Sequence, residues 1–191
     1  MRRMMTAMKT LRHLLAMLCL LATTAAAAAD PAKAMFGVEL GTRFLISPCP
    51  SGVDTMTSRL CYVENLTKKT RWGSEEHAVF YPSTSATPWA RGEMVVDVYQ
   101  GFIEAIYVNT WGIQGQGTAL EMLTKKYGPP ARAHSEKIPA HRSRYPSKFA
   151  EWDLKDFSVK LDGTTTTIDW GRITLITHRH RKIIESNSAV R

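Results

Sequence analysis

The chain has 191 residues, of which 44% are hydrophobic, which suits one domain with a hydrophobic core. Its formal net charge is +8, but four of its 25 basic residues and none of its 17 acidic residues precede residue 13. The remaining 21 basic and 17 acidic residues leave a charge of +4, which is too mild to indicate a nucleic-acid partner.

The N-terminus has the pattern of a secretory signal peptide. A basic start precedes the short apolar run 14–21, and Ala27 and Ala29 form an A-x-A site just before Asp30. The run is shorter than the about 20 apolar residues of a membrane-spanning helix. We therefore predict cleavage after Ala29, a single mature domain over 30–191 and a periplasmic or secreted location. An N-terminal membrane anchor that is never cleaved is the alternative.

Two cysteines, Cys49 and Cys61, remain in the predicted mature chain. In an oxidising compartment an isolated pair is most simply a disulfide. Closing this Ser-, Pro- and Gly-rich loop would stabilise the fold by roughly 2–3 kcal/mol. A redox-active pair and a metal site are the alternatives, but the spacing is not C-x-x-C and no histidine lies near either cysteine in sequence.

The first half of the mature chain predicts strands and loops. Strands are expected over 35–47 and 60–66, and the run 82–93, with two prolines and many small polar residues, is typical of a linker. The clearest hairpin follows, because 94–100 and 102–111 are dense in Val, Ile, Phe and Tyr and flank a glycine. Apolar residues at both parities of the second run predict a central strand.

A short helix is indicated within 112–130. Thr118 and Glu121 have the T-x-x-E spacing of a capping box, and apolar residues then recur on one face. Gly128, followed by two prolines, would end the helix. A helix of about nine residues is not stable alone in water. We expect it to cover one face of an antiparallel sheet, with the preceding hairpin as its nearest partner.

The rest of the chain predicts more strands. The stretch 131–148 would hold a strand and then a basic loop, and Asp162-Gly163 is typical of a hairpin turn. A parity change at 155–156 indicates a bulge or a bend. The expected strands after the loop are FAEWDL, FSVKLDG, TTTTIDWG and RITLITHRHRKII, before a frayed tail from about residue 185.

The expected fold class is therefore α+β. It would be a single antiparallel sheet of about six to eight strands, with one main helix packed on one face because sheets bury at least one face.

The sequence contains no G-x-S-x-G, P-loop, H-E-x-x-H or dinucleotide-binding motif, so it predicts no catalytic residue and no cofactor. His178 and His180 are the best metal candidates, since residues two apart on a strand share a face. Zinc needs three or four ligands, however, and the interleaved arginines would repel a cation. A solvated basic strand end is the alternative. His77, His141 or His178 would be the base if the protein were an unrecognised hydrolase.

Two basic segments could together form an anion-binding face. Arginine suits bidentate contacts to phosphate and carboxylate groups, which the cell envelope offers in phospholipid, lipopolysaccharide and peptidoglycan. Two unrelated solvated segments are the alternative. The candidate residues are Lys137, Arg142, Arg144, Lys148, Arg179, Arg181 and Lys182.

The segment TALEMLTKKYGPP, over 118–130, resembles the helix, Lys-Tyr-Gly-x-Pro and strand of small exported bacterial envelope proteins. Examples are the outer-membrane assembly lipoprotein and beta-lactamase-inhibitor-like families. The resemblance implies a helix laid on an antiparallel sheet, in a non-enzymatic protein that binds other proteins, and it carries over no site residue. We therefore expect an exported accessory or binding protein with an envelope protein as partner. A binder of anionic envelope components and a hydrolase are the alternatives.

Overall fold

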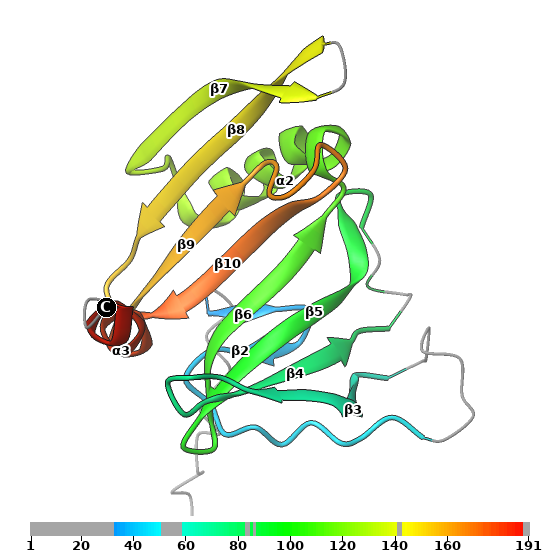
Figure 1. The fold of residues 1–191 in the computed structure, drawn as a ribbon, viewed down its shortest axis with the longest axis vertical. Helices are drawn as coiled ribbons and strands as arrows, with labels where there is room; N and C mark the ends of the chain where they lie inside the picture. The colour runs from blue at the N-terminus through cyan, green and yellow to red at the C-terminus, as the bar shows by residue number, and fades with distance from the viewer. Residues whose placement is uncertain (1–32, 51–58, 83–84, 86, 141–142, 189–191) are drawn as a thin grey trace, which may run out of the picture.

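The protein has an α+β fold, as the sequence predicts. The computed structural model describes residues 33–50, 59–82, 85, 87–140 and 143–188. The elements, in chain order, are β1 (Ala34–Met35), β2 (Val38–Glu39), β3 (Cys61–Lys69), β4 (Glu75–Phe80), β5 (Ala90–Tyr99), β6 (Phe102–Thr110), α2 (Gly112–Tyr127), β7 (Arg132–Ala140), β8 (Ser143–Asp153), β9 (Phe157–Asp162), β10 (Gly171–Thr177) and α3 (His178–Ser188). β1 pairs with β2, and the other eight strands form one antiparallel sheet in the order β3-β4-β5-β6-β10-β9-β8-β7 (Figure 1).

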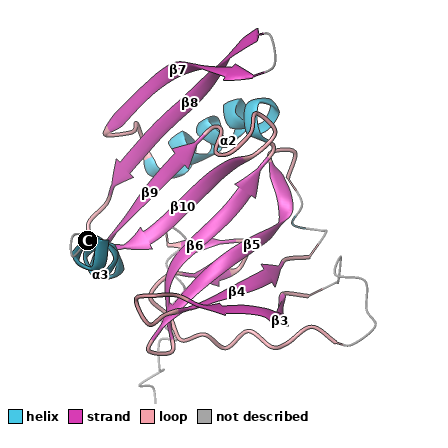
Figure 2. Cartoon of the chain, in the orientation of Figure 1, coloured by secondary structure: helices cyan, strands magenta, loops and turns pink. Residues whose placement is uncertain are grey.

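One face of the large sheet carries the hydrophobic core. In the view of Figure 1, α2 lies behind β8, β9 and β10, while β1 and β2 lie behind β5 and β6. We call this the covered face and the opposite one, which faces the viewer in Figure 2, the open face. The buried side chains of the covered face alternate along each strand, and they are Val79, Met94, Val96, Ile106, Val108, Ala150, Trp152, Val159, Leu161, Ile173 and Leu175.

The predicted β5–β6 hairpin and the predicted central strand are both confirmed. Gln100 and Gly101 have φ values of 53° and 80°, and a two-residue turn with two positive φ values matches the twist of paired strands. β6 stands between β5 and β10 in the interior of the sheet. Its residues are mostly buried at both parities, which explains why apolar side chains occupy both of its faces.

α2 begins earlier than the sequence predicts and ends where it predicts. It spans 16 residues from Gly112, and no side-chain cap bond forms at its start. The predicted capping box is therefore wrong, because Thr118 and Glu121 lie inside the helix. At the other end Gly128, with φ of 80°, donates its N–H to the carbonyl of Thr124 at 2.9 Å, which is how a left-handed glycine closes a helix.

The expected partner of α2 is also wrong, because the helix packs chiefly on β8, β9 and β10 and only slightly on β6. The polar anchor is Gln116, which is 4% exposed. Its Nε2 donates to the carbonyl of Pro146 at 2.8 Å, and its Oε1 accepts the N–H of Lys148 at 2.7 Å. These bonds fix α2 to the backbone of β8, far along the chain from the β5–β6 hairpin.

No helix in the part of the chain that the structure describes is both long and apolar enough to cross a membrane.

Two predictions for the N-terminal half are wrong. The strand expected over 35–47 is broken up, because Gly37 and Gly41, both with φ of 83°, turn the chain around β1 and β2. The run 82–93 is not linker throughout, because β5 already begins at Ala90. β4, which pairs with β3 and with β5, has no counterpart among the predicted strands.

Two further corrections concern 131–170. The basic loop expected before residue 148 belongs to the β7–β8 hairpin, so Arg144 and Lys148 lie on a strand. TTTTIDWG, expected as a strand, is the loop between β9 and β10, where the N–H of Thr165 donates to the carbonyl of Trp170 at 2.7 Å. The parity change at 155–156 marks the turn between β8 and β9.

The last predicted strand is correct only up to Thr177, after which the chain turns into α3. The hydroxyl of Thr177 accepts the N–H of His180 at 3.1 Å, which is the N-cap bond that starts many helices. α3 continues to Ser188, past the point at which a frayed tail is expected.

Candidate functional site

The predicted disulfide between Cys49 and Cys61 is present, with the two Cα atoms 4.9 Å apart. It holds the segment before it against β3, the first edge strand of the sheet. Cys49 donates its N–H to the carbonyl of Tyr62 at 2.8 Å, and Tyr62 donates to Ser47 at 3.1 Å. This edge is therefore partly covered by residues 47–49. Part of the loop that the disulfide closes, 51–58, lies outside the described residues.

Replacing both cysteines with serine (C49S/C61S) is expected to lower the free energy of unfolding by roughly 2–3 kcal/mol, because the unfolded chain regains the freedom of the closed loop. Urea unfolding of the variant and of the oxidised protein measures this difference. Reduced wild-type protein is the matched control and should resemble the variant. Equal stability of oxidised and reduced protein would contradict the expectation.

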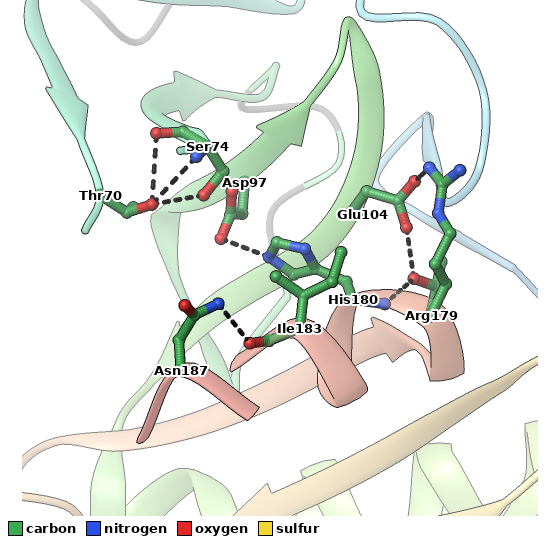
Figure 3. A network of polar contacts seen from close by, with 9 residues as sticks. Thr70, Ser74, Asp97, Glu104, Arg179, His180, Ile183 and Asn187 are labelled. Carbon is green, nitrogen blue, oxygen red and sulfur yellow. Dashed lines mark hydrogen bonds and ion pairs between the residues drawn. The ribbon is translucent and has the colours of Figure 1, made fainter. Parts of the chain in front are cut away.

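α3 is fixed to the open face by a buried histidine–aspartate pair. Nε2 of His180 lies 2.9 Å from Oδ2 of Asp97 on β5, and both side chains are 0% exposed (Figure 3). Nδ1 of His180 and Oδ1 of Asp97 are buried without a hydrogen-bond partner. The ring of Tyr99 lies 6.0 Å away between centroids. Each side chain of this pair is thus the other's polar contact, and no hydroxyl or thiol of the described residues hydrogen-bonds to the imidazole.

The neighbouring arginines of α3 also contact the sheet. Arg179 forms an ion pair with Glu104, whose side chain is 3% exposed (Figure 3). Glu104 also accepts a hydrogen bond from the hydroxyl of Thr177. Arg181 donates to Ser158 and lies 3.7 Å from Glu151.

The candidate anion-binding residues that the structure describes do not gather on one face. Arg179 and Arg181 are engaged by carboxylates, while Lys182 is exposed. Lys137 and Arg144 lie toward the tip of the β7–β8 hairpin, whereas α3 lies near the other end of β8 (Figure 1). Lys148 lies on the same hairpin beside α2, and Arg142 lies outside the described residues.

The two metal candidates both lie in the first turn of α3 and contact different carboxylates. His178 and His180 are on a helix and not on a strand, and Nε2 of His178 lies 3.1 Å from Asp153 while His180 bonds to Asp97. Among the described residues, no group of three or more His, Cys, Asp or Glu side chains could hold a metal ion.

His77 sits on the covered face, 7% exposed, and is stacked on Phe44 at 4.4 Å between ring centroids. Its Nδ1 lies 3.1 Å from the hydroxyl of Thr67, and its Nε2 lies 3.7 Å from Glu75. Burial lowers the pKa of His77 more than Glu75 and Asp97 raise it, so the neutral imidazole is favoured. The carboxylate is beyond hydrogen-bond distance, so these groups form no oriented catalytic triad. His141 lies outside the described residues.

Apart from α3 at one end, no helix of the described chain covers the open face (Figure 2). Two half-buried aromatic side chains on this face, Tyr107 and Phe149, each lie close to a cationic side chain. Arg172 lies 5.8 Å from the ring centroid of Tyr107, and Lys160 lies 5.1 Å from that of Phe149. Burial, with Asp97 and Glu76, raises the pKa of Tyr107, so its hydroxyl stays protonated. The central residues of this face are Glu93, Val95, Tyr107, Asn109, Phe149, Glu151, Lys160, Asp162, Arg172 and Thr174.

Sequence reasoning did not find the Asp97–His180 pair, nor a second polar cluster at the end of the sheet. There the guanidinium of Arg91 lies 3.9 Å from the ring of Trp111 and 3.8 Å from that of Trp170. All three come from segments far apart in the chain, so no local pattern points to them. Neither a protein-family model, nor a curated protein, nor a solved structure matches this chain.

Proposed function

We propose that this is an exported, non-enzymatic binding or accessory protein of the cell envelope, and that it binds a protein partner on its open face. The observation that carries the proposal is the make-up of that face. It combines half-buried rings, as at Tyr107 and Phe149, with charges of both signs. Aromatic residues and arginine are enriched in protein interfaces.

The charges favour a protein over an anionic lipid or glycan. Lys160 and Arg172 alternate on the open face with Glu93, Glu151 and Asp162, so the face has no single sign. A polyanion would meet these carboxylates as well as the cations, whereas a protein surface can present both complementary signs.

Export is supported by the leader pattern and by the disulfide. A disulfide persists in oxidising compartments and is rare in the cytosol, and the structure contains one between Cys49 and Cys61. The proposed cleavage residues Ala27, Ala29 and Asp30 lie outside the described residues. Intact mass of the protein recovered from an exporting host should place its N-terminus at Asp30. A chain that keeps residues 1–29 would contradict cleavage.

Photo-cross-linking in cells tests the binding surface. A benzophenone side chain is placed at Thr174, in the centre of the open face, or at Glu121, exposed on α2 as the matched control. Cross-linking from Thr174 to one discrete protein, and not from Glu121, is expected. The variant R172E should weaken that cross-link while K125E, with the same charge change on α2, should not.

Two results would overturn the proposal. Equal cross-linking from both positions would mean that the open face is not the binding surface. Recovery of lipopolysaccharide or peptidoglycan that salt removes, without a cross-linked protein, would favour the anionic-envelope reading, since salt screens such contacts.

A further inference from the structure

β7 is an edge strand that nothing in the described chain covers. It bonds to β8 alone, at the end of the strand order. Residues 132–137 are exposed at every position, so solvent reaches β7 from both faces. The opposite edge differs, because residues 47–49 pair along part of β3. An uncovered edge strand is a template for pairing with another chain.

The hydrogen bonds of β8 show which backbone groups of β7 point outward. The carbonyl of Lys148 accepts the N–H of Gly163, at the end of β9, at 2.7 Å, and the carbonyl of Pro146 accepts from Gln116 of α2. Even-numbered residues of β8 therefore direct their backbone away from β7, and odd-numbered ones direct it toward β7. Phe149 is paired with His134, so His134 directs its N–H and C=O toward β8.

The residues of β7 on either side of His134 direct their backbone groups away from β8. Ala133, Ser135 and Lys137 thus point their N–H and C=O groups to the open side of the strand. Pro139 has the same parity but no N–H, and proline in a sheet is tolerated where its nitrogen faces no partner strand. The outward ladder therefore covers residues 133–137 and ends at the proline.

The charges along this edge are complementary to themselves. Arg132 and Glu136 lie two residues on either side of His134, on the same face. In an antiparallel pairing of two copies about a two-fold axis at His134, Arg132 of each copy faces Glu136 of the other. An axis at Ala133 would instead place Arg132 opposite His134 of the other copy, and an axis at Ser135 would place it opposite Ile138. Only the register centred on His134 forms two ion pairs.

We propose that β7 pairs with β7 of a second copy in this register, giving one continuous antiparallel sheet. The pairs Ala133–Ser135 would exchange backbone hydrogen bonds across the axis, and the side chains of His134 would meet on it. The axis is perpendicular to the sheet, so the open faces of both copies lie on the same side. This dimer does not depend on the proposed function, because it needs no other partner.

A single-cysteine scan over residues 132–136 reads the register directly. Residues opposite each other in a non-hydrogen-bonded pair have Cα atoms about 4.5 Å apart, which suits a disulfide. H134C is therefore expected to give the most oxidised dimer on non-reducing gels, because only residue 134 faces its own copy. A133C and S135C are matched controls and should give little. A maximum at either control position, or no dimer at any position, overturns the proposal.

Charge reversal supplies the second test, by sedimentation equilibrium of the full exported chain. E136R and R132E each replace two attractive contacts with two repulsive ones and should each weaken the homodimer at least about tenfold. Mixed together, the two variants regain both attractive contacts and should form a heterodimer of wild-type affinity. E121R, on α2, is the control for E136R. Wild-type protein that remains monomeric up to its solubility limit, or variants that do not complement each other, overturns the proposal.

Arg132 also bonds to Glu151 at 2.9 Å, and its side chain is 72% exposed. R132E places a carboxylate opposite Glu151, and such a like-charge pair costs up to about 1 kcal/mol, so the variant should unfold only a few degrees below the wild type. That measurement separates loss of pairing from loss of folding.

Discussion

Replacing His180 with alanine is expected to lower the free energy of unfolding by about 3–5 kcal/mol, the cost of removing one partner of a buried pair. His180 and Asp97 are 0% exposed, and Oδ1 of Asp97 has no other hydrogen-bond partner. In the variant the carboxyl group of Asp97 would stay buried with no polar contact to its side chain in the described structure. α3 would also lose its buried contact with β5. Urea unfolding at neutral pH measures the change.

A double replacement distinguishes the pair from simple loss of volume. D97L/H180L removes both polar groups and should be less destabilised than H180A, since hydrophobic residues of similar volume often replace a buried pair at little cost. K182A, at an exposed position of the same helix, should change stability by no more than about 0.5 kcal/mol. If H180A unfolds with the same urea midpoint as K182A, the Asp97–His180 pair does not stabilise the fold.

Local signals explain the parts of the fold that the sequence predicts correctly. The turn at Gln100-Gly101 joins two strands that pair directly, and Gly128 ends α2 through a bond to a residue four positions earlier. The disulfide joins two cysteines only 12 residues apart. In each case the residues that determine the structure lie close together in the chain, so a short stretch of sequence is enough to predict it.

The wrong predictions have non-local causes. RITLITHRHRKII has β-branched residues throughout its first half, and the change to a helix depends on the cap by Thr177 and on contacts of His180 with Asp97, 83 residues away. α2 resembles a cover for the preceding hairpin, yet Gln116 bonds to β8, about 30 residues later. Such pairings are set by the strand order, which periodicity does not contain.

The candidate site, too, is predictable from the sequence only where its features are local. Each basic residue could be identified from sequence, but not the carboxylates that engage Arg179 and Arg181. The open face could not be predicted, because its residues come from five strands that a single sequence does not place side by side. The self-complementary edge of β7 is different. Its charges lie within five residues, and only the knowledge that β7 is an edge strand was missing.

Replacing Trp152 with alanine is expected to lower the free energy of unfolding by about 3–5 kcal/mol, as for other buried aromatic side chains. Trp152 of β8 is 2% exposed, and its ring lies 6.3 Å from that of Tyr127 between centroids. Its Nε1 donates to the carbonyl of Gly128 at 2.8 Å. The side chain thus joins the end of α2 to the strand that carries the β7–β8 hairpin. Urea unfolding measures the loss.

The variant W152F separates packing from the hydrogen bond. It retains an aromatic ring but leaves the carbonyl of Gly128 without the indole donor, so a loss of about 1–3 kcal/mol is expected. Leu45 is 83% exposed, and L45A is therefore a control for hydrophobic truncation without burial. If W152A were no more destabilised than L45A, α2 would not depend on this contact. The β7–β8 hairpin would then need another anchor, which Gln116 offers through its two hydrogen bonds to the backbone of β8.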